Sequence, residues 1–394
     1  MKESLFNYRF EYENQKYIFN TNNNGLIQIN NDIFTEEERE YLRVNRFWVD
    51  DNEDEIALLE REINHNIQKR QKELELTIAL TNYCNFSCVY CYQNKNEKLM
   101  TTEVANMIIE KIDRILNDNI FEGINIHYFG GEPLLNIPVL IYLDENIKKI
   151  TDKIGIVYKA FLTTNGSMLS KELLQKVKFS SIQLTFDGLE KTHDRLRVSD
   201  HFHFKEEIEL IENIMNFSQA KVLLRTNICK ENKDEIIALH KYIFEKFGNE
   251  RIEINPNRTI KYHQDDSFEM LSVQEYAEVA YQIKLLWSEQ KGKFELPVPI
   301  STPCKFPYGN AYAISPEGYC TFCSGSMDQE KKYFFDVDIE NKKMFSVRKE
   351  CKKCNILPLC LGGCIIQYNL RAGACTYEKY ELKNILISYI KHIS

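Results

Sequence analysis

Three cysteines stand within eight residues, at Cys84, Cys88 and Cys91, in the spacing C-x3-C-x2-C. They follow an alternating apolar run, 74–80, that predicts a β-strand, so we expect the thiols on a loop at its carboxyl end. Three thiolates on one loop can hold three irons of a [4Fe–4S] cluster and leave the fourth iron open to a small molecule. The alternative is a zinc loop with a distant fourth ligand, but zinc motifs favour C-x2-C pairs and a closed set of four ligands.

A second group of functional residues follows the next predicted strand, 124–129. There Gly130 and Gly131 let the backbone approach a ligand closely, and Glu132 can accept a hydrogen bond from a ligand ammonium group. Alone, such a run is explained by a plain turn. Beside the three cysteines it resembles the motif with which radical S-adenosylmethionine (SAM) enzymes hold the amino group of SAM next to their cluster.

The ends of the later strands extend this resemblance. Thr185 and Arg197 are similar to the Ser-x-Asp-Gly and downstream arginine pattern of peptide-modifying radical SAM enzymes, which implies that Thr185 contacts SAM and Arg197 binds its carboxylate. Arginine suits a carboxylate because its guanidinium donates two parallel hydrogen bonds. The resemblance also implies SAM contacts for Asn165 and Arg225, and stacking of Tyr90 on the adenine. The alternative is that the polar residues cap strands or turns and that Tyr90 only packs the loop.

Eight of the twelve cysteines lie between positions 304 and 375, which points to metal sites, since a disulfide framework is not expected in a reducing compartment. Their spacing resembles the SPASM domain, a C-terminal extension with two auxiliary [4Fe–4S] clusters. The resemblance assigns the outer cluster to Cys351, Cys354, Cys360 and Cys375, and the inner cluster to Cys304, Cys323 and Cys364. A pair of zinc ribbons is the alternative.

The fourth ligand of the inner cluster stays open at this stage. Some members of the family supply it about six residues after the first cysteine, where this chain has Asn310. Either Cys320 fills the position, which we favour because it lies three residues before Cys323, or one iron is open and can bind a substrate thiolate. Cys229 fits no motif and follows an apolar strand, so we expect a buried structural thiol.

Strands and helices alternate from residue 74 to residue 290, which predicts an α/β fold with a parallel sheet and right-handed crossovers. The strands are expected at 74–80, 124–129, 156–162, 181–186, 222–227 and 252–255. Six units are too few for a closed eightfold barrel, so we predict a partial (β/α)6 TIM-like barrel. In such folds the chemistry lies at the carboxyl ends of the strands, where the cysteine motif and the polar residues above are placed.

Two further domains flank the barrel in this interpretation. Residues 1–73 predict a small N-terminal α+β module, with three short strands and a capping box of Thr35 and Glu38 that opens a helix. Such a module can bind a leader peptide by strand addition, or it can be a structural cover. Residues 291–394 form the predicted SPASM domain and end in an amphipathic helix.

Bulk properties exclude several classes of function. The chain has 394 residues, a formal net charge of −8, 43% hydrophobic residues and 27% charged residues, as in ordinary globular proteins. The negative charge argues against general nucleic-acid binding. No signal-peptide core and no apolar run of membrane-spanning length occur, so we expect a cytoplasmic protein without a membrane partner.

The resemblance implies a radical SAM enzyme with SAM and three [4Fe–4S] clusters, one that binds SAM and two auxiliary. Our first expectation is a maturase that forms a thioether or carbon–carbon cross-link in a ribosomally made precursor peptide with a leader, and that takes electrons from a flavodoxin-type reductase. Formylglycine formation, as in anaerobic sulfatase maturases, and peptide epimerisation are the enzyme alternatives. An iron–sulfur electron carrier or sensor is the non-enzyme alternative, but it has no need of a SAM pocket.

Overall fold

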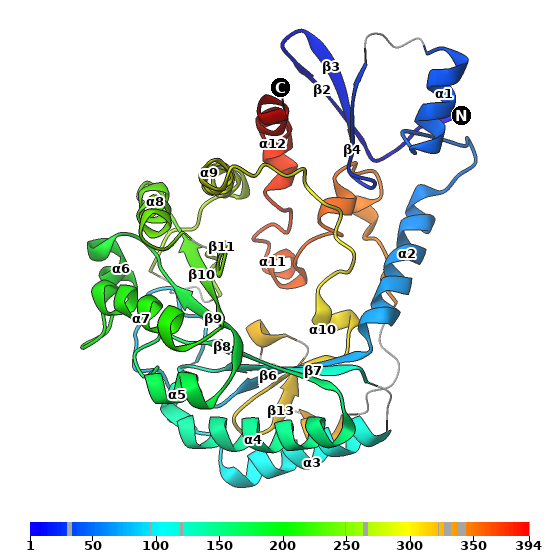
Figure 1. The fold of residues 1–394 in the computed structure, drawn as a ribbon. Helices are drawn as coiled ribbons and strands as arrows, with labels where there is room; N and C mark the ends of the chain where they lie inside the picture. Colours follow the sequence, from blue (N-terminus) through cyan, green and yellow to red (C-terminus); the bar gives the residue numbers. More distant parts are fainter. Residues whose placement is uncertain are drawn as a thin grey trace. The chain divides into compact units, whose positions relative to one another are not determined.

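The computed structural model describes residues 1–29, 34–94, 96–118, 121–248, 250–262, 267–321, 323–326, 332–337 and 344–393 (Figure 1). The chain forms two compact units, each assembled from separate stretches. Unit 1 contains Met1–Gln68, Ser272–Cys304 and Lys343–Ser394, and unit 2 contains Lys69–Leu271 and Lys305–Lys342. No helix among the described residues combines the length and the apolarity that a membrane crossing requires.

Unit 2 is built on six parallel strands that lie side by side in chain order, which confirms the predicted partial barrel. The strands are β6 (Glu73–Ala79), β7 (Gly123–Phe129), β8 (Val157–Thr163), β9 (Phe179–Thr185), β10 (Lys221–Ile228) and β11 (Ile252–Arg258). Alternate residues such as Leu74, Leu76 and Ile78 are at most 1% exposed. Because side chains alternate between the two faces of a strand, these apolar residues face the helices, and the residues between them face the other side of the sheet, where polar side chains can lie.

Amphipathic helices connect these strands and cover one face of the sheet (Figure 1). They are α3 (Thr102–Asp118), α4 (Ile137–Ile154), α5 (Lys171–Lys176), α6 (Glu190–Leu196), α7 (Phe204–Phe217) and α8 (Ile236–Phe247), with a short 3-10 turn, η1 (Pro133–Asn136), before α4. In α3, for example, Ile108, Ile112 and Ile115 are buried. The apolar faces predicted for α3, α7 and α8 are buried, for example at Ile208 and Ile211 of α7 and at Leu239 and Ile243 of α8.

The sheet continues beyond β6 with residues that the sequence assigned to the C-terminal domain. After the short helix α10 (Lys305–Tyr308), β12 (Ala311–Ile314) pairs in parallel with β6, and β13 (Tyr319–Thr321), β14 (Lys332–Tyr333) and the turn η3 (Phe334–Asp336) follow. The chain therefore returns to unit 2 after residue 304, which differs from the predicted boundary at 290. The physical reason is that the open edge of β6 needs a hydrogen-bonding partner.

Unit 1 begins with the predicted N-terminal module. It contains a three-stranded meander of β2 (Asn7–Tyr12), β3 (Gln15–Asn20) and β4 (Gly25–Ile29), a pair of β1 (Lys2–Glu3) with β5 (Trp48–Val49), and the helices α1 (Glu36–Val44) and α2 (Glu55–Arg70). The capping box is present, since the Thr35 side chain accepts from the Glu38 N–H and the Glu38 side chain accepts from the Thr35 N–H.

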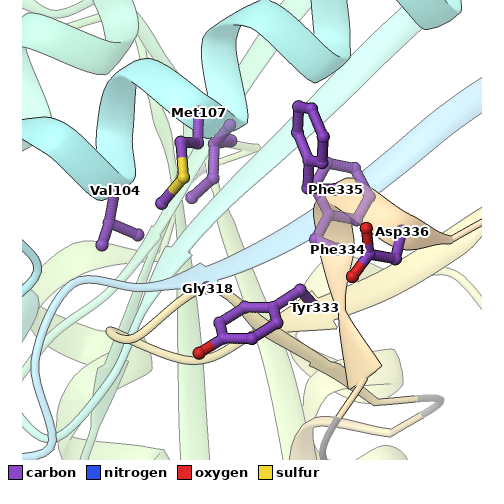
Figure 2. A pocket seen from close by; sticks show the side chains of 8 residues that line it. Val104, Met107, Gly318, Tyr333, Phe334, Phe335 and Asp336 are labelled. Carbon is purple, nitrogen blue, oxygen red and sulfur yellow. The ribbon is translucent and has the colours of Figure 1, made fainter.

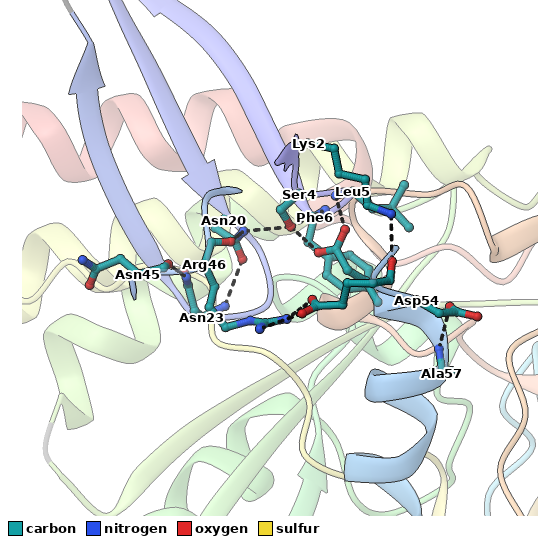
Figure 3. A network of polar contacts seen from close by, with 12 residues as sticks. Lys2, Ser4, Leu5, Phe6, Asn20, Asn23, Asn45, Arg46, Asp54 and Ala57 are labelled. Atoms are coloured by element: carbon teal, nitrogen blue, oxygen red, sulfur yellow. Dashed lines mark hydrogen bonds and ion pairs between the residues drawn. The ribbon is translucent and has the colours of Figure 1, made fainter. Parts of the chain in front are cut away.

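A network of polar contacts closes this module (Figure 3). The buried carboxylate of Glu55 accepts from the Ser4 hydroxyl at 2.5 Å and from the Leu5 N–H at 2.8 Å. The Ser4 hydroxyl in turn accepts from the Asn20 amide at 3.3 Å. Because buried donors without acceptors are costly, this network fixes the start of α2 against the first strands.

The rest of unit 1 brings distant segments onto the module. Its elements are α9 (Val273–Lys291), η4 (Lys349–Cys351), η5 (Leu357–Leu359), α11 (Ile365–Asn369) and α12 (Glu378–Ile393). One apolar core joins Phe10 and Phe19 of the meander to Ile356 and Leu359 near η5 and to Leu386 of α12. The N-terminal module and the segment that carries the last five cysteines therefore share one core.

Candidate active site

The cysteine loop, residues 84–91, leaves the carboxyl end of β6 as the sequence predicts. Burial raises the pKa of the Cys88 thiol to about 12, the positive charge of Arg197 opposes this shift, and the neighbouring Cys91 and Cys84 add to it. The three thiols are therefore close enough to feel one another's charge. The Cys88 thiol therefore keeps its proton at neutral pH until a metal replaces it.

The Gly-Gly-Glu run is joined to the strand end that leads into this loop. The Gly131 N–H donates to the Thr81 carbonyl at 2.8 Å, and the Glu132 N–H donates to the Tyr83 carbonyl at 2.8 Å. A Cβ on Gly130 would overlap the Thr81 carbonyl oxygen, and a Cβ on Gly131 would overlap the Tyr83 carbonyl oxygen. Both glycines are thus required by the close approach of two strand ends, and this contact positions the cysteine loop.

The opposite side of the loop is bound to the segment after α6. The Val89 N–H donates to the Leu196 carbonyl at 3.0 Å and the Ser87 N–H donates to the Val198 carbonyl at 2.8 Å. These two bonds bracket Cys88 in the loop and Arg197 in the partner segment. The sequence interval between the loop and Arg197 is long, but the backbone pairing brings the two together.

Asn165 holds the first cysteine. Its side-chain N–H group donates to the Cys84 sulfur at 3.8 Å and to the Asn85 side chain at 2.8 Å, while its side-chain oxygen accepts from the Ser167 N–H at 3.0 Å and from the Ser167 hydroxyl at 2.7 Å. The partners of this amide are therefore in the protein itself. Asn165 orients the cysteine loop in this structure, and its predicted contact with SAM stays a prediction.

Glu132 is fully buried and already holds three donors. One carboxylate oxygen accepts from the Leu134 N–H at 3.0 Å and the Thr164 hydroxyl at 2.6 Å, and the other accepts from the Asn165 N–H at 2.6 Å. Burial nevertheless raises the pKa of Glu132 to about 7, with the three hydrogen bonds opposing it. The carboxylate ties the ends of β7 and β8 together, whatever it contributes to a ligand.

Arg197 is a buried cation with a donor atom that makes no hydrogen bond. The residue is 6% exposed, its Nε has no hydrogen-bond partner, and its guanidinium lies 5.4 Å from the centre of the Phe86 ring. Burial works against its charge, yet Glu207 and the nearby Tyr90, Cys88 and Asp187 hold the pKa of Arg197 well above its usual range. A charge-assisted donor in this state is suited to a ligand carboxylate.

Tyr90 is anchored through its hydroxyl, which donates a short hydrogen bond to Asp187. Its ring packs against a small apolar cluster of Leu196, Cys229 and Phe268. Asp187 is fully buried and also accepts from the Asn227 N–H at 2.7 Å, and burial raises its pKa, with the charge of Arg197 opposing. The Ser-x-Asp-Gly resemblance includes Asp187, but the sequence interpretation assigned it no role as the partner of Tyr90.

Thr185, Arg225 and Cys229 lie where the strand assignment placed them. Thr185 and Arg225 pair across β9 and β10, at the carboxyl end of the sheet. Arg225 donates through Nε to the Asn227 side chain at 2.8 Å. Cys229 is fully buried, as expected for a structural thiol, and its N–H donates to the Asn232 side chain at 2.9 Å.

Two tyrosines that sequence reasoning missed connect the cysteine loop to the Cys323 segment. Tyr92 follows Cys91 directly and stacks on Tyr262, with 4.8 Å between the ring centroids. The Tyr92 hydroxyl lies 3.5 Å from the Ser324 carbonyl oxygen. The Cβ position of Gly325 lies 3.3 Å from the Tyr262 hydroxyl and 3.6 Å from the Cys323 sulfur. The stacked pair therefore links the residue after Cys91 to the segment that follows Cys323.

His127, to which the sequence assigned no chemistry, lies on β7 with its Nε2 2.7 Å from the Thr163 hydroxyl. Its ring contacts Phe129 and Phe161 edge-on. Burial lowers the pKa of His127 to about 4, and the charge of Lys305 adds to this shift. A neutral imidazole at the strand ends can donate or accept a hydrogen bond at neutral pH.

The four cysteines of the predicted outer cluster come together within unit 1. Burial raises the pKa of the Cys360 thiol to about 11; the Gly362 N–H, which donates to its sulfur at 3.4 Å, opposes the shift, and the nearby Cys354, Cys351 and Cys375 add to it. Burial also raises the pKa of Cys351, against the charge and hydrogen bond of Arg348. Four thiols that influence one another in this way fit a shared cluster.

The cysteines of the predicted inner cluster are distributed over both units, with Cys304 and Cys364 in unit 1 and Cys323 in unit 2. The Cys323 sulfur accepts from the Gly325 N–H at 3.3 Å. Cys320 is 4% exposed and lies on β13, where it pairs with Ile314 of β12. Burial raises the pKa of Tyr312, and the nearby Cys320 adds to this shift. Ile314 pairs with Ile78 of β6, so the register places Cys320 on the helix-covered face of the sheet.

In the part of the chain that the structure describes, no three His, Cys, Asp or Glu side chains stand close enough to share one metal ion. A [4Fe–4S] cluster does not require such closeness, because each cysteine binds a different iron.

A separate cavity of about 310 Å³ opens in unit 2 between α3 and η3 (Figure 2). Val104 and Met107 line it from one side, and Tyr333, Phe334 and Phe335 from the other. None of the residues predicted to bind a cofactor lines this cavity. The cysteine loop and the cavity are therefore separate features of unit 2.

Comparisons with known proteins agree with this geometry. Residues 78–243 match the model of the radical SAM superfamily. One relative, the radical SAM cyclopropyl synthase TigE of Paramaledivibacter caminithermalis, is 24% identical over 372 residues, which cover 83% of this chain and 76% of that protein. Another relative is an uncharacterized protein of Methanocaldococcus jannaschii. It is 34% identical over 119 residues, which cover 29% of this chain and only 39% of that protein's length.

Solved structures share the fold. The chain superposes on anSMEcpe with bound AdoMet and Cp18Cys peptide with a TM-score of 0.62 and 18% identity, covering 80% of this chain and 99% of that one. It superposes on SuiB of Streptococcus suis bound to the precursor peptide SuiA with a TM-score of 0.56 and 16% identity, covering 96% and 98%. These likenesses establish the fold of both units.

The contact between the strand ends predicts the effect of a single methyl group. Gly131→Ala should remove as much iron as Cys84→Ala does, because the added Cβ forces the Tyr83 carbonyl and the cysteine loop away. Iron and sulfide per chain after anaerobic reconstitution measure this loss. Gly155→Ala is the control, since its position has open space and only its backbone φ of 82° is strained. Full iron content in Gly131→Ala would contradict the positioning role.

The raised pKa of Glu132 predicts a pH-dependent stability difference. Between pH 4.5 and 7 the unfolded chain has lost the Glu132 proton while the folded chain keeps it, so the native state loses up to about 1.4 kcal/mol per pH unit from this group as pH rises. Glu132→Gln lacks this loss. Its destabilisation relative to wild type should therefore shrink as pH rises from 5 to 7.

Thermal unfolding of both proteins at each pH measures this difference, with the exposed Glu110→Gln as the control that should show a constant gap. A gap for Glu132→Gln that stays constant over the same range is the result that contradicts the assignment.

Proposed function

Because residues 78–243 match the model of the radical SAM superfamily, we propose that this protein is a radical SAM enzyme that binds SAM at a [4Fe–4S] cluster on Cys84, Cys88 and Cys91 and modifies a ribosomally made peptide. The observation that carries the proposal is the enclosed guanidinium of Arg197, with an unpartnered Nε, held beside three thiols by two backbone hydrogen bonds. A guanidinium that binds a carboxylate, together with an iron that has an open position, can hold the amino-acid part of SAM.

The residues of the site fit this cofactor pair. Arg197 would bind the carboxylate of SAM, and Thr185 would make a polar contact at the end of β9. Gly130 and Gly131, beside Glu132, would bind the amino group. The chemistry that the pair supplies when bound is abstraction of a hydrogen atom from an unactivated carbon by a 5′-deoxyadenosyl radical. The remaining work of the chain is to orient the cofactor and to exclude water and oxygen.

Other predicted SAM contacts have competing partners in the fold. Tyr90 is bound to Asp187 and Asn165 to Cys84, which supports positioning of the cysteine loop as their first role. Adenine stacking on Tyr90 and a contact from Arg225 remain part of the proposal. His127, neutral and next to Thr163, is a candidate for contact with the substrate.

We place two auxiliary [4Fe–4S] clusters in the cysteine-rich region. Cys351, Cys354, Cys360 and Cys375 would close the outer one, and their mutual influence within unit 1 supports this. Cys304, Cys323 and Cys364 would hold the inner one. The burial of Cys320 on the helix-covered face of the sheet favours an open fourth iron over ligation by Cys320.

The substrate is a precursor peptide with a leader in this proposal. Two proteins with the same fold, anSMEcpe and SuiB, are described with bound peptides. In unit 1, a groove of about 370 Å³ runs along β4 and is lined by Ile27, Ile29, Phe34, Tyr41 and Leu42. Because β4 pairs with β3 and lies at the edge of its sheet, a leader can add a strand there and place alternate side chains in the groove.

The product is a thioether or carbon–carbon cross-link, with epimerisation and formylglycine formation as the competing outcomes. A relative named as a cyclopropyl synthase supports carbon–carbon bond formation. A flavodoxin-type reductase would supply electrons, and the cytoplasm is the compartment in which such a donor and reduced clusters persist.

The proposal is tested by anaerobic incubation of the reconstituted enzyme with SAM, a chemical reductant and candidate precursor peptides. We expect 5′-deoxyadenosine and a peptide that has lost two hydrogens without gaining aldehyde reactivity. Cys88→Ala should reduce 5′-deoxyadenosine to background, while Cys229→Ala should retain it. Absence of 5′-deoxyadenosine from the wild-type enzyme would refute SAM cleavage. A peptide that takes up deuterium from deuterated solvent, but keeps its mass in ordinary water, would indicate epimerisation in place of cross-linking.

The groove in unit 1 has its own prediction. Tyr41→Ala, which removes an exposed wall of the groove, should weaken binding of a leader-containing peptide about tenfold, since burial of one aromatic side chain contributes on the order of 1.5 kcal/mol or more. Fluorescence anisotropy of a labelled leader measures it. Glu37→Ala, exposed on the same helix and outside the groove lining, is the control. Equal affinity of both variants and wild type would remove the groove from the proposal.

A further inference from the structure

Two cationic side chains interact with cysteine sulfurs of the predicted outer cluster. The Lys379 ammonium lies 3.5 Å from the Cys375 sulfur and donates to it. The Arg348 guanidinium donates a hydrogen bond to the Cys351 thiol. These two cysteines belong to different parts of the segment, Cys351 to η4 and Cys375 to the chain just before α12. The positive charges therefore come from two separate elements.

Both cations are held in place by the fold. Arg348 lies with its guanidinium carbon 4.3 Å from the centre of the Tyr368 ring, and its terminal nitrogen is 3.1 Å from the Cβ position of Gly362. A side chain at Gly362 would displace it. Lys379 stands in the first turn of α12, one helical turn after Cys375. The nearby acidic group is Glu350, 3.8 Å from Arg348.

The potential of an iron–sulfur cluster depends on the charge and the hydrogen bonds that its sulfur ligands receive. Reduction adds one negative charge to the cluster, so a nearby cation stabilises the reduced form more than the oxidised form. Two cations and one carboxylate leave a net positive charge beside the outer cysteines. The neutral donor on Cys360, the Gly362 N–H at 3.4 Å, acts in the same direction.

We propose that Lys379 and Arg348 raise the reduction potential of the outer auxiliary cluster. An electron that reaches either auxiliary cluster then resides on the outer one. This rests on the outer cluster of the proposed function. Arg348 is the stronger of the two because it is half-buried, whereas Lys379 is exposed and its charge is screened by salt. Glu350 acts in the opposite sense.

The test is a potentiometric titration of the reconstituted full-length enzyme, followed by electron paramagnetic resonance. The outer-cluster signal is identified as the one that Cys360→Ala removes. Arg348→Gln should shift its midpoint to more negative potential, changing the ratio of reduced to oxidised cluster at fixed potential about tenfold, which is about 59 mV for a one-electron couple. Lys379→Gln should give a smaller negative shift that disappears at high salt.

Matched controls separate charge from fold. Lys349→Gln and Lys383→Gln remove exposed charges on η4 and α12 themselves and should leave the midpoint unchanged. Arg348→Lys and Lys379→Arg keep the charge and should keep most of the potential. Glu350→Gln should shift the midpoint to more positive potential, and it provides the test if the glutamine variants of the cations lose iron.

The outcomes distinguish the inference from the proposal beneath it. If Cys360→Ala removes no cluster, the outer cluster itself is refuted. If it removes one, but the midpoint is the same in Arg348→Gln, Lys379→Gln and Glu350→Gln, the cluster stands and the role of the cations is overturned.

Discussion

The candidate site depends on how closely two strand ends approach each other. Gly130 and Gly131 lie where any Cβ would overlap the carbonyls of Thr81 and Tyr83, and two backbone hydrogen bonds lock the contact. That junction fixes the start of the cysteine loop and brings Glu132 into the interior, where it ties β7 to β8. Close approach of backbone is a demand that only glycine meets, so the Gly-Gly pair serves the architecture of the loop before it serves any ligand.

A second constraint acts from the far side of the loop. The residues around Cys88 pair through backbone hydrogen bonds with the segment of Arg197, which makes the cation and the thiol neighbours. Placing a charge in the interior is costly without a partner. The cost is offset in part by Glu207 and Asp187, and the arrangement keeps one donor atom available to an incoming anion. The pairing of these two short segments therefore sets both the position of the Cys88 thiol and the positive charge beside it.

The sequence predicted much of this, and the reasons differ between residues. Strand order, the helical faces and the capping box of Thr35 follow from local periodicity and short-range hydrogen bonding, which are encoded within a few residues. The return of β12 to pair with β6 was not predictable from such signals, because partner choice at a sheet edge depends on the whole fold. The anchoring of Tyr90 by Asp187 and the stacking of Tyr92 on Tyr262 were missed for the same reason: each joins residues far apart in sequence.

The pairing of β12 with β6 has a consequence for how the protein is made. β6 is the first strand of its sheet to leave the ribosome, and its outer edge stays unpaired until Ala311–Ile314 has been synthesised, after all the other parallel strands. An unpaired edge is a template for association with other chains, and closing so long a loop is slow. The nascent chain therefore passes through a stage at which β6 to β11 have all been synthesised while β6, the strand that carries the cysteine loop, is still open on one side.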